Sequence, residues 1–160
     1  QARIPSIQAL NPEIEPELID GAVAQLRRDP ACVVSTVASP FAPDEDPADP
    51  NIVKVVCRGD RRALYFSRAL IPHARADVVE AAAPFKHVGL YVYRRSFLPI
   101  YRDLAATPLE TTEQLEQLRV LEHGHAITVH VGVAHHHGID TPEQYAAFVA
   151  RHRSKRSEPV

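Results

Sequence analysis

The fold class of this chain is decided by the stretch TPLETTEQLEQLRVLEHGHAITVHV (Thr107–Val131), which GIDTPEQY (Gly138–Tyr145) follows after a histidine-rich segment. Thr107 is suited to cap a helix, and Pro108 loses no hydrogen bond at the first helical position. Glu110 stands three residues after the cap, where its carboxylate can accept a bond from the cap amide. These signals predict the order helix, strand, loop, helix.

The middle of this stretch changes from helical to strand periodicity. Leucines recur at helical spacing up to Gly124, which is suited to end a helix. From Ala126 to Val133, apolar side chains alternate with Thr128 and His130, which predicts a strand with one face on a core. Asp140 then lies between a strand end and a new helix start, where ligands bind in α/β sheets.

The rest of the chain also favours an α/β class. Helices are predicted over 16–27 and over 94–104, the second interrupted or kinked by Pro99. Strands are predicted in four places, at 32–37, 51–57, 63–67 and 88–93. The turn residues Arg58-Gly59-Asp60 join two of these strands as a hairpin. An acidic, proline-rich loop is expected over 39–50, and a long connection over 71–85.

Composition indicates a single soluble domain. The chain has 160 residues, is 45% hydrophobic and carries a net charge of −2, so nothing drives it toward nucleic acid or anionic membranes. No apolar run reaches membrane-spanning length. Cys32 and Cys57 fall inside apolar strand-like runs, which favours buried free thiols and a cytoplasmic setting. We expect one α/β domain over 1–150 and a polar tail over 151–160.

Several ordered motifs together resemble one enzyme family. They are IEPELID (14–20), DPNIVKVV (49–56), ALYFSRALIPH (63–73), KHVGLYVYRRSFL (86–98), LEQLRVLEHG (115–124) and GIDTPEQY. In this order they are similar to the C-terminal region of 3-deoxy-manno-octulosonate (Kdo) cytidylyltransferases. The resemblance implies a three-layer α/β sandwich around a mostly parallel, Rossmann-like sheet of the nucleotide-diphospho-sugar transferase type, with a small antiparallel extension. It also implies a homodimer.

The same resemblance suggests roles for individual side chains. It implies that Arg68 binds the sugar-acid carboxylate, that His87 and Tyr91 line the sugar pocket, and that Glu116 and Gln117 bind sugar hydroxyls. Asp140 matches a Mg²⁺ ligand and is the one catalytic residue expected here. From the residues alone, the alternative for Arg68 is a solvated loop arginine, for His87 a structural histidine and for Tyr91 a core aromatic. Glu116 and Gln117 would then lie on a solvated helix face, and Asp140 would be a carboxylate stabilised by a helix N-terminus.

The N-terminal CTP-binding region of the family is largely missing. Arg3, Ser6 and Gln8 match nucleotide-binding positions, but the glycine-containing phosphate-binding segment expected after Ser6 does not follow. Ala9-Leu10-Asn11 stand where the family has Gly, Asp and Glu. The resemblance therefore implies that one of two metal-binding carboxylates is absent. If these 160 residues are the whole protein, we expect weak or no CTP turnover, because triphosphate charge needs a divalent cation and an array of donors.

Three functions follow from these observations. The first is a CMP-Kdo synthetase of lipopolysaccharide biosynthesis, which joins CTP and Kdo with Mg²⁺ and releases pyrophosphate. The second is a catalytically defective remnant that acts as a sugar-acid-binding or dimerisation module. The third is a metal-binding protein, because six histidines lie within fifteen residues at positions 123, 125, 130 and 135–137. Their irregular spacing favours an exposed loop over a dedicated metal site.

Overall fold

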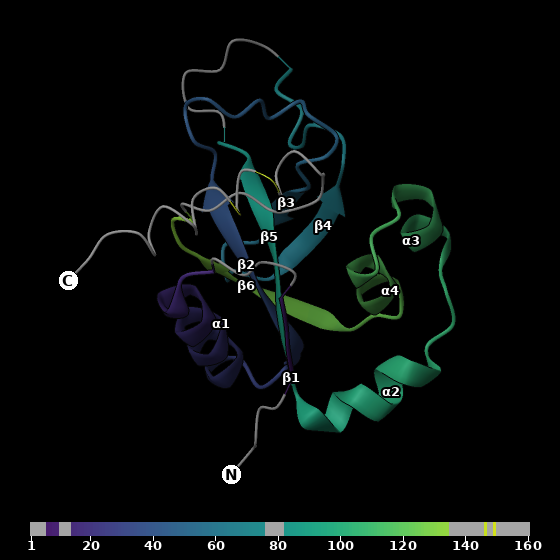
Figure 1. Cartoon of the computed structure of the whole chain (residues 1–160). Coiled ribbons are helices and arrows are strands. Elements are labelled where there is room, and N and C mark those ends of the chain that lie inside the picture. Colours follow the sequence, from purple (N-terminus) through teal and green to yellow (C-terminus); the bar gives the residue numbers. More distant parts are fainter. Residues whose placement is uncertain (1–5, 10–13, 76–81, 135–145, 147–148, 150–160) are drawn as a thin grey trace, which may run out of the picture.

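The computed structural model describes the backbone of residues 6–9 and the residues 14–75, 82–134, 146 and 149. A six-stranded sheet lies at the centre (Figure 1). Its strands are β1 (Ser6–Ala9), β2 (Cys32–Pro40), β3 (Lys54–Cys57), β4 (Ala63–Ser67), β5 (Phe85–Tyr93) and β6 (Ala126–Val131). The helices are α1 (Pro16–Arg28), α2 (Leu98–Asp103) after a 3₁₀ turn at Arg95–Phe97, α3 (Pro108–Glu113) and α4 (Gln117–Glu122).

The sheet is mixed, and its strand directions explain the expectation of a mostly parallel sheet. Because β1, β2 and β3 each pair antiparallel with β5, these three strands run in one direction. β6 pairs parallel with β2 and shares that direction, whereas β4 runs back along β3. Four strands are thus co-directional. β5 runs antiparallel to the strands on either side of it, and β2–β6 is the parallel pairing of the described sheet. The antiparallel part of the sheet is therefore larger than the small extension that we expected.

Helices cover the two faces of the sheet, which confirms the α/β class and the three layers. α1 covers one face, where its buried residues Leu18, Ala22 and Leu26 pack with Val88, Leu90 and Val92 of β5. The segment from the 3₁₀ turn to α4 covers the other face with Phe97, Leu115, Leu118 and Val120 (Figure 1). The alternation of β5 side chains directs its apolar residues to α1 and its aromatic residues to the opposite face.

The predicted helix from Thr107 to Gly124 is wrong as a single helix. It begins as predicted, with the Glu110 carboxylate accepting the Thr107 amide at 3.3 Å. It then breaks at Gln114, whose backbone is left-handed with φ 53° and ψ 49°, and α4 starts three residues later. The leucines keep their helical spacing across this break, so the sequence pattern did not indicate it.

The helix predicted over 94–104 also differs from the structure. Pro99 stands in the first turn of α2, where a missing amide hydrogen costs nothing, so it marks a helix start and does not interrupt one. The strands at 32–37, 51–57, 63–67, 88–93 and 126–133 are confirmed with shifts of a few residues at their ends. β3 and β4 form the predicted hairpin.

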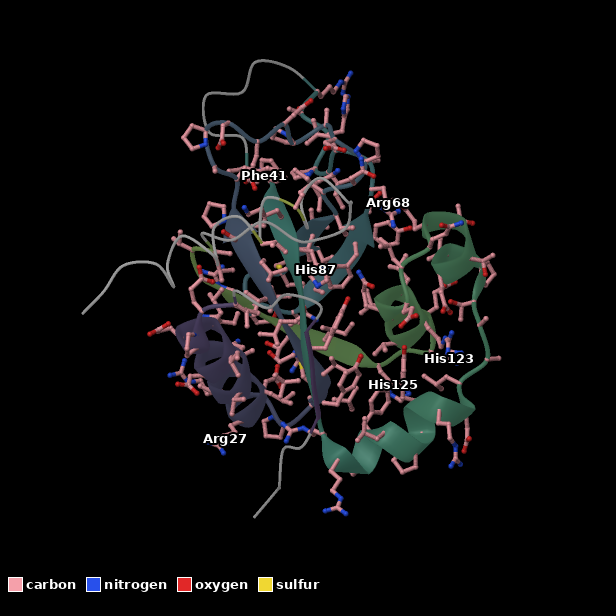
Figure 2. The ribbon with its side chains drawn as sticks, viewed as in Figure 1. Arg27, Phe41, Arg68, His87, His123 and His125 are labelled. Atoms are coloured by element: carbon pink, nitrogen blue, oxygen red, sulfur yellow. The ribbon has the colours of Figure 1, made fainter. Side chains whose placement is uncertain are left out.

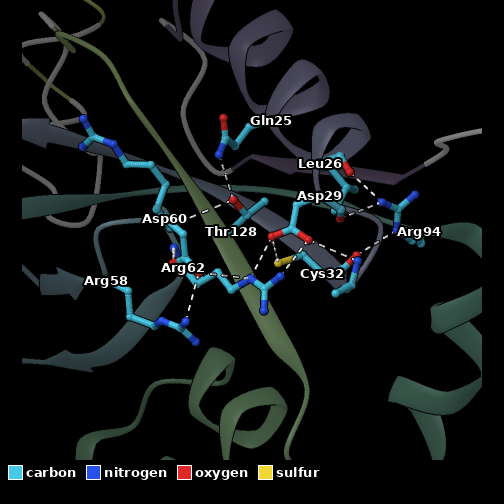
Figure 3. A network of polar contacts seen from close by, with 11 residues as sticks. Gln25, Leu26, Asp29, Cys32, Arg58, Asp60, Arg62, Arg94 and Thr128 are labelled. Atoms are coloured by element: carbon cyan, nitrogen blue, oxygen red, sulfur yellow. Dashed lines mark hydrogen bonds and ion pairs between the residues drawn. The ribbon is translucent and has the colours of Figure 1, made fainter.

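A polar network closes the sheet toward the end of α1 (Figure 3). The Arg62 guanidinium donates to both carboxylate oxygens of Asp29, with N···O distances of 2.7 and 3.0 Å. Arg94 donates to the carbonyls of Leu26, Asp29 and Cys32. The backbone of Arg62 also forms an isolated antiparallel β-bridge with Thr128 of β6. The beginning of β4 therefore touches the opposite edge of the sheet.

The expectation of buried free thiols is confirmed for Cys32 and only in part for Cys57. Cys32 and Cys57 are free thiols, the first buried and the second half-buried. Burial raises the pKa of the Cys32 thiol to about 12, so the thiol stays protonated. None of the described helices has the length and apolar character needed to cross a lipid bilayer. The division into a domain over 1–150 and a tail over 151–160 stays a prediction.

Candidate functional site

Aromatic rings form a row on the face of β5 that points away from α1. The His87 ring lies 5.1 Å from that of Phe66 and 5.4 Å from that of Tyr91. Tyr91 lies 6.1 Å from Tyr93, and Tyr93 lies 5.7 Å from Tyr101 of α2. The period of two along β5 places His87, Tyr91 and Tyr93 on one face of the strand. Tyr93 belongs to the buried core, and Tyr91 and Tyr101 are half-buried against it.

His87 is held by a hydrogen bond from the neighbouring strand. Its Nε2 lies 2.8 Å from Oγ1 of Thr36, a buried residue of β2. Burial lowers the pKa of His87 to about 4, so the imidazole is neutral at physiological pH. A neutral ring cannot attract an anion by charge, but it can exchange hydrogen bonds with hydroxyl groups.

The residue before α4, Glu116, places a carboxylate near this face. Glu116 is exposed, whereas Gln117 is buried, so the solvated-helix alternative fails for Gln117. Burial raises the pKa of Tyr91 well above its usual value, and the neighbouring tyrosines and the charge of Glu116 add to this effect. The same carboxylate contributes to the raised pKa of Tyr93 and Tyr101. Glu116 therefore lies electrostatically close to the aromatic row, and all three phenols stay protonated.

Arg68 follows β4 and lies beside the connection from α3 to α4 (Figure 2). Its Nε donates to the Glu113 carbonyl at 2.8 Å, and its Nη1 donates to the Pro50 carbonyl at 3.0 Å. The Glu113 carboxylate accepts the Arg68 amide at 2.9 Å and the Ser67 hydroxyl at 2.7 Å. Nη2 donates to no described residue. Arg68 is half-buried, and its guanidinium is thus oriented by two main-chain carbonyls, unlike that of a solvated loop arginine.

Lys54 is a site-supporting residue that sequence reasoning missed. It is completely buried, and its ammonium donates to the carbonyls of Asp49 at 2.9 Å, Ile52 at 2.6 Å and Arg68. It therefore ties the loop before β3 to the backbone of Arg68. A lysine inside the apolar run IVKVV was the available signal, because a strand buried on both faces rarely holds an unpaired charge.

For the remaining predicted residues, the structure describes no side chain. Arg3 and Asp140 lie outside the described residues, and for Ser6 and Gln8 only the backbone in β1 is described. No group of three metal-ligating side chains occurs among the described residues.

The described histidines of the histidine-rich segment lie apart from one another in the structure. His123 contacts the Ala105 carbonyl at 3.0 Å, and His125 packs edge-on against Phe97. Both labelled side chains lie next to α4 in Figure 2, whereas His130 lies under Gly21 of α1 on the other face. These three do not form a metal centre, and residues 135–137 lie outside the described part of the chain.

Comparisons with known proteins agree with this architecture. A model of the cytidylyltransferase family matches residues 1–127. The chain belongs to the cytidylyltransferase family. It is 45% identical to the 3-deoxy-manno-octulosonate cytidylyltransferase of Syntrophotalea carbinolica, across 94% of this chain and 63% of that protein. It is 42% identical to the enzyme of the same name from Methylibium petroleiphilum, across 96% of this chain and 62% of that protein.

A solved structure shows the same fold in a related protein. The cytidylyltransferase chain is similar to CMP:2-keto-3-deoxy-manno-octonic acid synthetase complexed with CTP, with a TM-score of 0.81 and 36% identity. The match covers 91% of this chain and 59% of that one. This cytidylyltransferase chain thus spans about three-fifths of the length of the relatives it matches.

Proposed function

We propose that this cytidylyltransferase chain carries the sugar-acid half of a CMP-Kdo synthetase, which converts CTP and Kdo to CMP-Kdo and pyrophosphate. The relatives carry that name, and the described site has the groups that a sugar acid needs. Kdo combines one carboxylate with several hydroxyls on a ring. A fitting site therefore offers one oriented cation, several neutral hydrogen-bonding groups and a flat apolar surface.

The observation that carries this proposal is the position of Arg68. Two of its nitrogens are fixed on the carbonyls of Glu113 and Pro50, while its remaining donors are available. Fixing the guanidinium in advance reduces the entropy lost when a carboxylate binds. Glu113, whose carbonyl accepts from Arg68, lies three positions before Glu116. The residues proposed to bind the carboxylate and the hydroxyls of the sugar acid therefore lie together at the connection between α3 and α4.

The nucleotide half of the reaction is proposed on the resemblance. Arg3, Ser6 and Gln8 would contact CTP, and Asp140 would hold Mg²⁺ together with nucleotide phosphates. A single carboxylate suffices for Mg²⁺ only when phosphate oxygens supply further ligands. We further propose a homodimer in the cytoplasm that serves lipopolysaccharide synthesis.

The test is isothermal titration of the chain with Kdo, and separately with CTP and Mg²⁺. We expect Kdo to bind, and its C1 methyl ester, which lacks the carboxylate charge, to bind at least tenfold more weakly. R68M should weaken the binding of Kdo and leave the binding of the ester unchanged, so that the two ligands bind with similar affinity. R102M is the matched control, because Arg102 is exposed and paired with the adjacent Asp103.

The results separate the parts of the proposal. Equal affinity for Kdo and its ester would contradict the role of Arg68, and no Kdo binding would contradict the sugar-acid function. Pyrophosphate release on mixing CTP, Mg²⁺ and Kdo would establish the full reaction. Kdo binding without CTP binding would limit this chain to the sugar half.

A further inference from the structure

The hydrogen bonds around Thr36 determine where the proton of His87 resides. Thr36 Oγ1 lies 2.7 Å from the Leu90 carbonyl oxygen and 2.8 Å from His87 Nε2. A carbonyl oxygen can only accept, so the single hydroxyl proton of Thr36 is used on Leu90. The Thr36 oxygen must then accept from His87, and Nε2 must carry the imidazole proton.

This arrangement depends on an irregularity in the sheet. The register between β2 and β5 shifts between Thr36 and Val37, so that Thr36 pairs with Tyr91 while Val37 pairs with Val88. The shift leaves Gly89 and Leu90 of β5 opposite no residue of β2. Thr36 can therefore reach the Leu90 carbonyl and the His87 ring with one hydroxyl.

The other nitrogen of the ring is consequently a hydrogen-bond acceptor. A neutral imidazole with its proton on Nε2 has a lone pair on Nδ1. Nδ1 receives no hydrogen bond from any described residue, since the hydrogen bond of the ring to Thr36 is made by Nε2. The depressed pKa of His87 keeps the ring neutral, in agreement with this proton count.

We propose that Thr36 is a positioning residue, which holds His87 as the Nε2–H tautomer so that Nδ1 accepts a hydrogen bond from a hydroxyl of the bound sugar acid. The assignment of the hydroxyl rests on the proposed function, whereas the tautomer does not. Recognition of the sugar acid is then divided between two residues. Arg68 binds the carboxylate, and His87 selects for a hydroxyl donor. A ligand that presents an acceptor to Nδ1 is rejected, because two lone pairs would meet.

Nitrogen NMR of the ¹⁵N-histidine-labelled chain tests the tautomer without any ligand. The His87 signals are assigned as those lost in H87Q. We expect Nδ1 unprotonated and Nε2 protonated from pH 5 to pH 8, and a population with the proton on Nδ1 to appear in T36V. T36S, which keeps the hydroxyl, should match the unmodified chain. A proton on Nδ1 in the unmodified chain would overturn the proposal.

Titration with Kdo tests the hydroxyl contact. Saturating Kdo should move the Nδ1 signal toward its hydrogen-bonded value and leave Nε2 in place. T36V should weaken Kdo binding about tenfold, the loss expected for one hydrogen bond, while T36S should not. Kdo binding without a change at Nδ1 would overturn the hydroxyl assignment and leave the proposed function intact. Absence of Kdo binding would overturn both, and the ligand-free tautomer result would still decide the role of Thr36.

A second pair of variants covers the case in which T36V does not fold. Asparagine places its amide oxygen near the position of Nδ1, whereas glutamine places its amide nitrogen near that of Nε2. We expect H87N to keep more Kdo affinity than H87Q, because the first retains the acceptor that faces the sugar. The opposite order would contradict the proposal. H123Q is the control, since the His123 ring bonds to the Ala105 carbonyl and not to Thr36.

Discussion

At the scale of single residues, buried charges fix the loops that carry the site. Lys54 replaces water around its ammonium with three main-chain carbonyls, and burial lowers its pKa. Lys86, its partner across β3 and β5, is almost as buried and pairs with Glu45 at 2.6 Å. Two cations on adjacent strands thus hold opposite ends of the acidic loop between β2 and β3.

Lys54→Met is expected to destabilise the protein by about 2–4 kcal/mol, because three buried carbonyls lose their donor. The same change should weaken Kdo binding, since the Arg68 backbone is released. Urea unfolding and titration with Kdo measure the two effects. R27M, at an exposed position of α1, is expected to change stability by less than about 0.5 kcal/mol. Equal stability of the two variants would show that the carbonyls find other partners.

Asp29 is the residue that makes stability depend on acid. Hydrogen bonds from Arg62, and then from the Cys32 thiol and the Ala31 amide, outweigh burial and lower its pKa from 3.8 to about 2. A carboxyl group whose folded pKa is depressed stabilises the protein above its unfolded pKa. That contribution is lost as pH falls from about 4 to about 2.

We therefore expect D29N to lower stability at pH 7 and to flatten its decline between pH 4 and pH 2. Urea unfolding at several pH values measures the slope. D103N serves as the control, because Asp103 pairs with Arg102 at an exposed position and should leave the slope unchanged. A steep acid slope in D29N would assign the dependence to another carboxyl group.

At the scale of elements, the break between α3 and α4 determines what the site contains. The turn at Gln114 lets the Glu113 carboxylate reach β4 while Leu115 enters the core. In one continuous helix, residues 113 and 116 would lie on one face, and they could not serve β4 and the aromatic row separately.

Gln114→Gly is expected to stabilise the protein by about 0.5–1 kcal/mol, because glycine adopts the left-handed conformation without a Cβ clash. Thr112→Gly, inside α3, should destabilise it by a similar amount. Thermal unfolding of the two variants compares them directly. Destabilisation by both would mean that the Gln114 side chain contributes more than its backbone costs.

These elements also show what sequence could predict. Periodicity predicted α1, the β3–β4 hairpin and residues 88–93 of β5, because each has one apolar face at a regular spacing. It missed the Gln114 turn, where no glycine or proline interrupts the pattern and where contacts with β4 decide the backbone. The resemblance supplied Arg68 and His87 as candidates, but the partners that orient them, Glu113 and Thr36, depend on a helix break and a register shift.

At the scale of the whole molecule, the sheet curls until its two edges meet. The Val129 amide of β6 donates to the Arg61 carbonyl at 2.8 Å, just before β4 begins. Arg62 holds this turn against the end of α1 through Asp29 (Figure 3). An edge that would otherwise offer free backbone groups is thus partly closed.

We expect R62A to accelerate hydrogen exchange of the Val129 amide about tenfold, because the turn loses its anchor and the edge opens locally. The amide of Val92, in the middle of the sheet, should exchange as in the unmodified protein. Exchange mass spectrometry or NMR measures both. Unchanged protection of Val129 would show that the backbone bridge holds without the ion pair.

The row of rings along β5 gives this protein a built-in optical probe. The chain contains five tyrosines and no tryptophan, so tyrosine dominates its ultraviolet fluorescence. Three of the five stand within one row, at centroid distances of 6.1 and 5.7 Å, where excitation passes readily from ring to ring. A ligand that binds against any one of these rings therefore alters the emission of all three, and occupancy can be followed without a label.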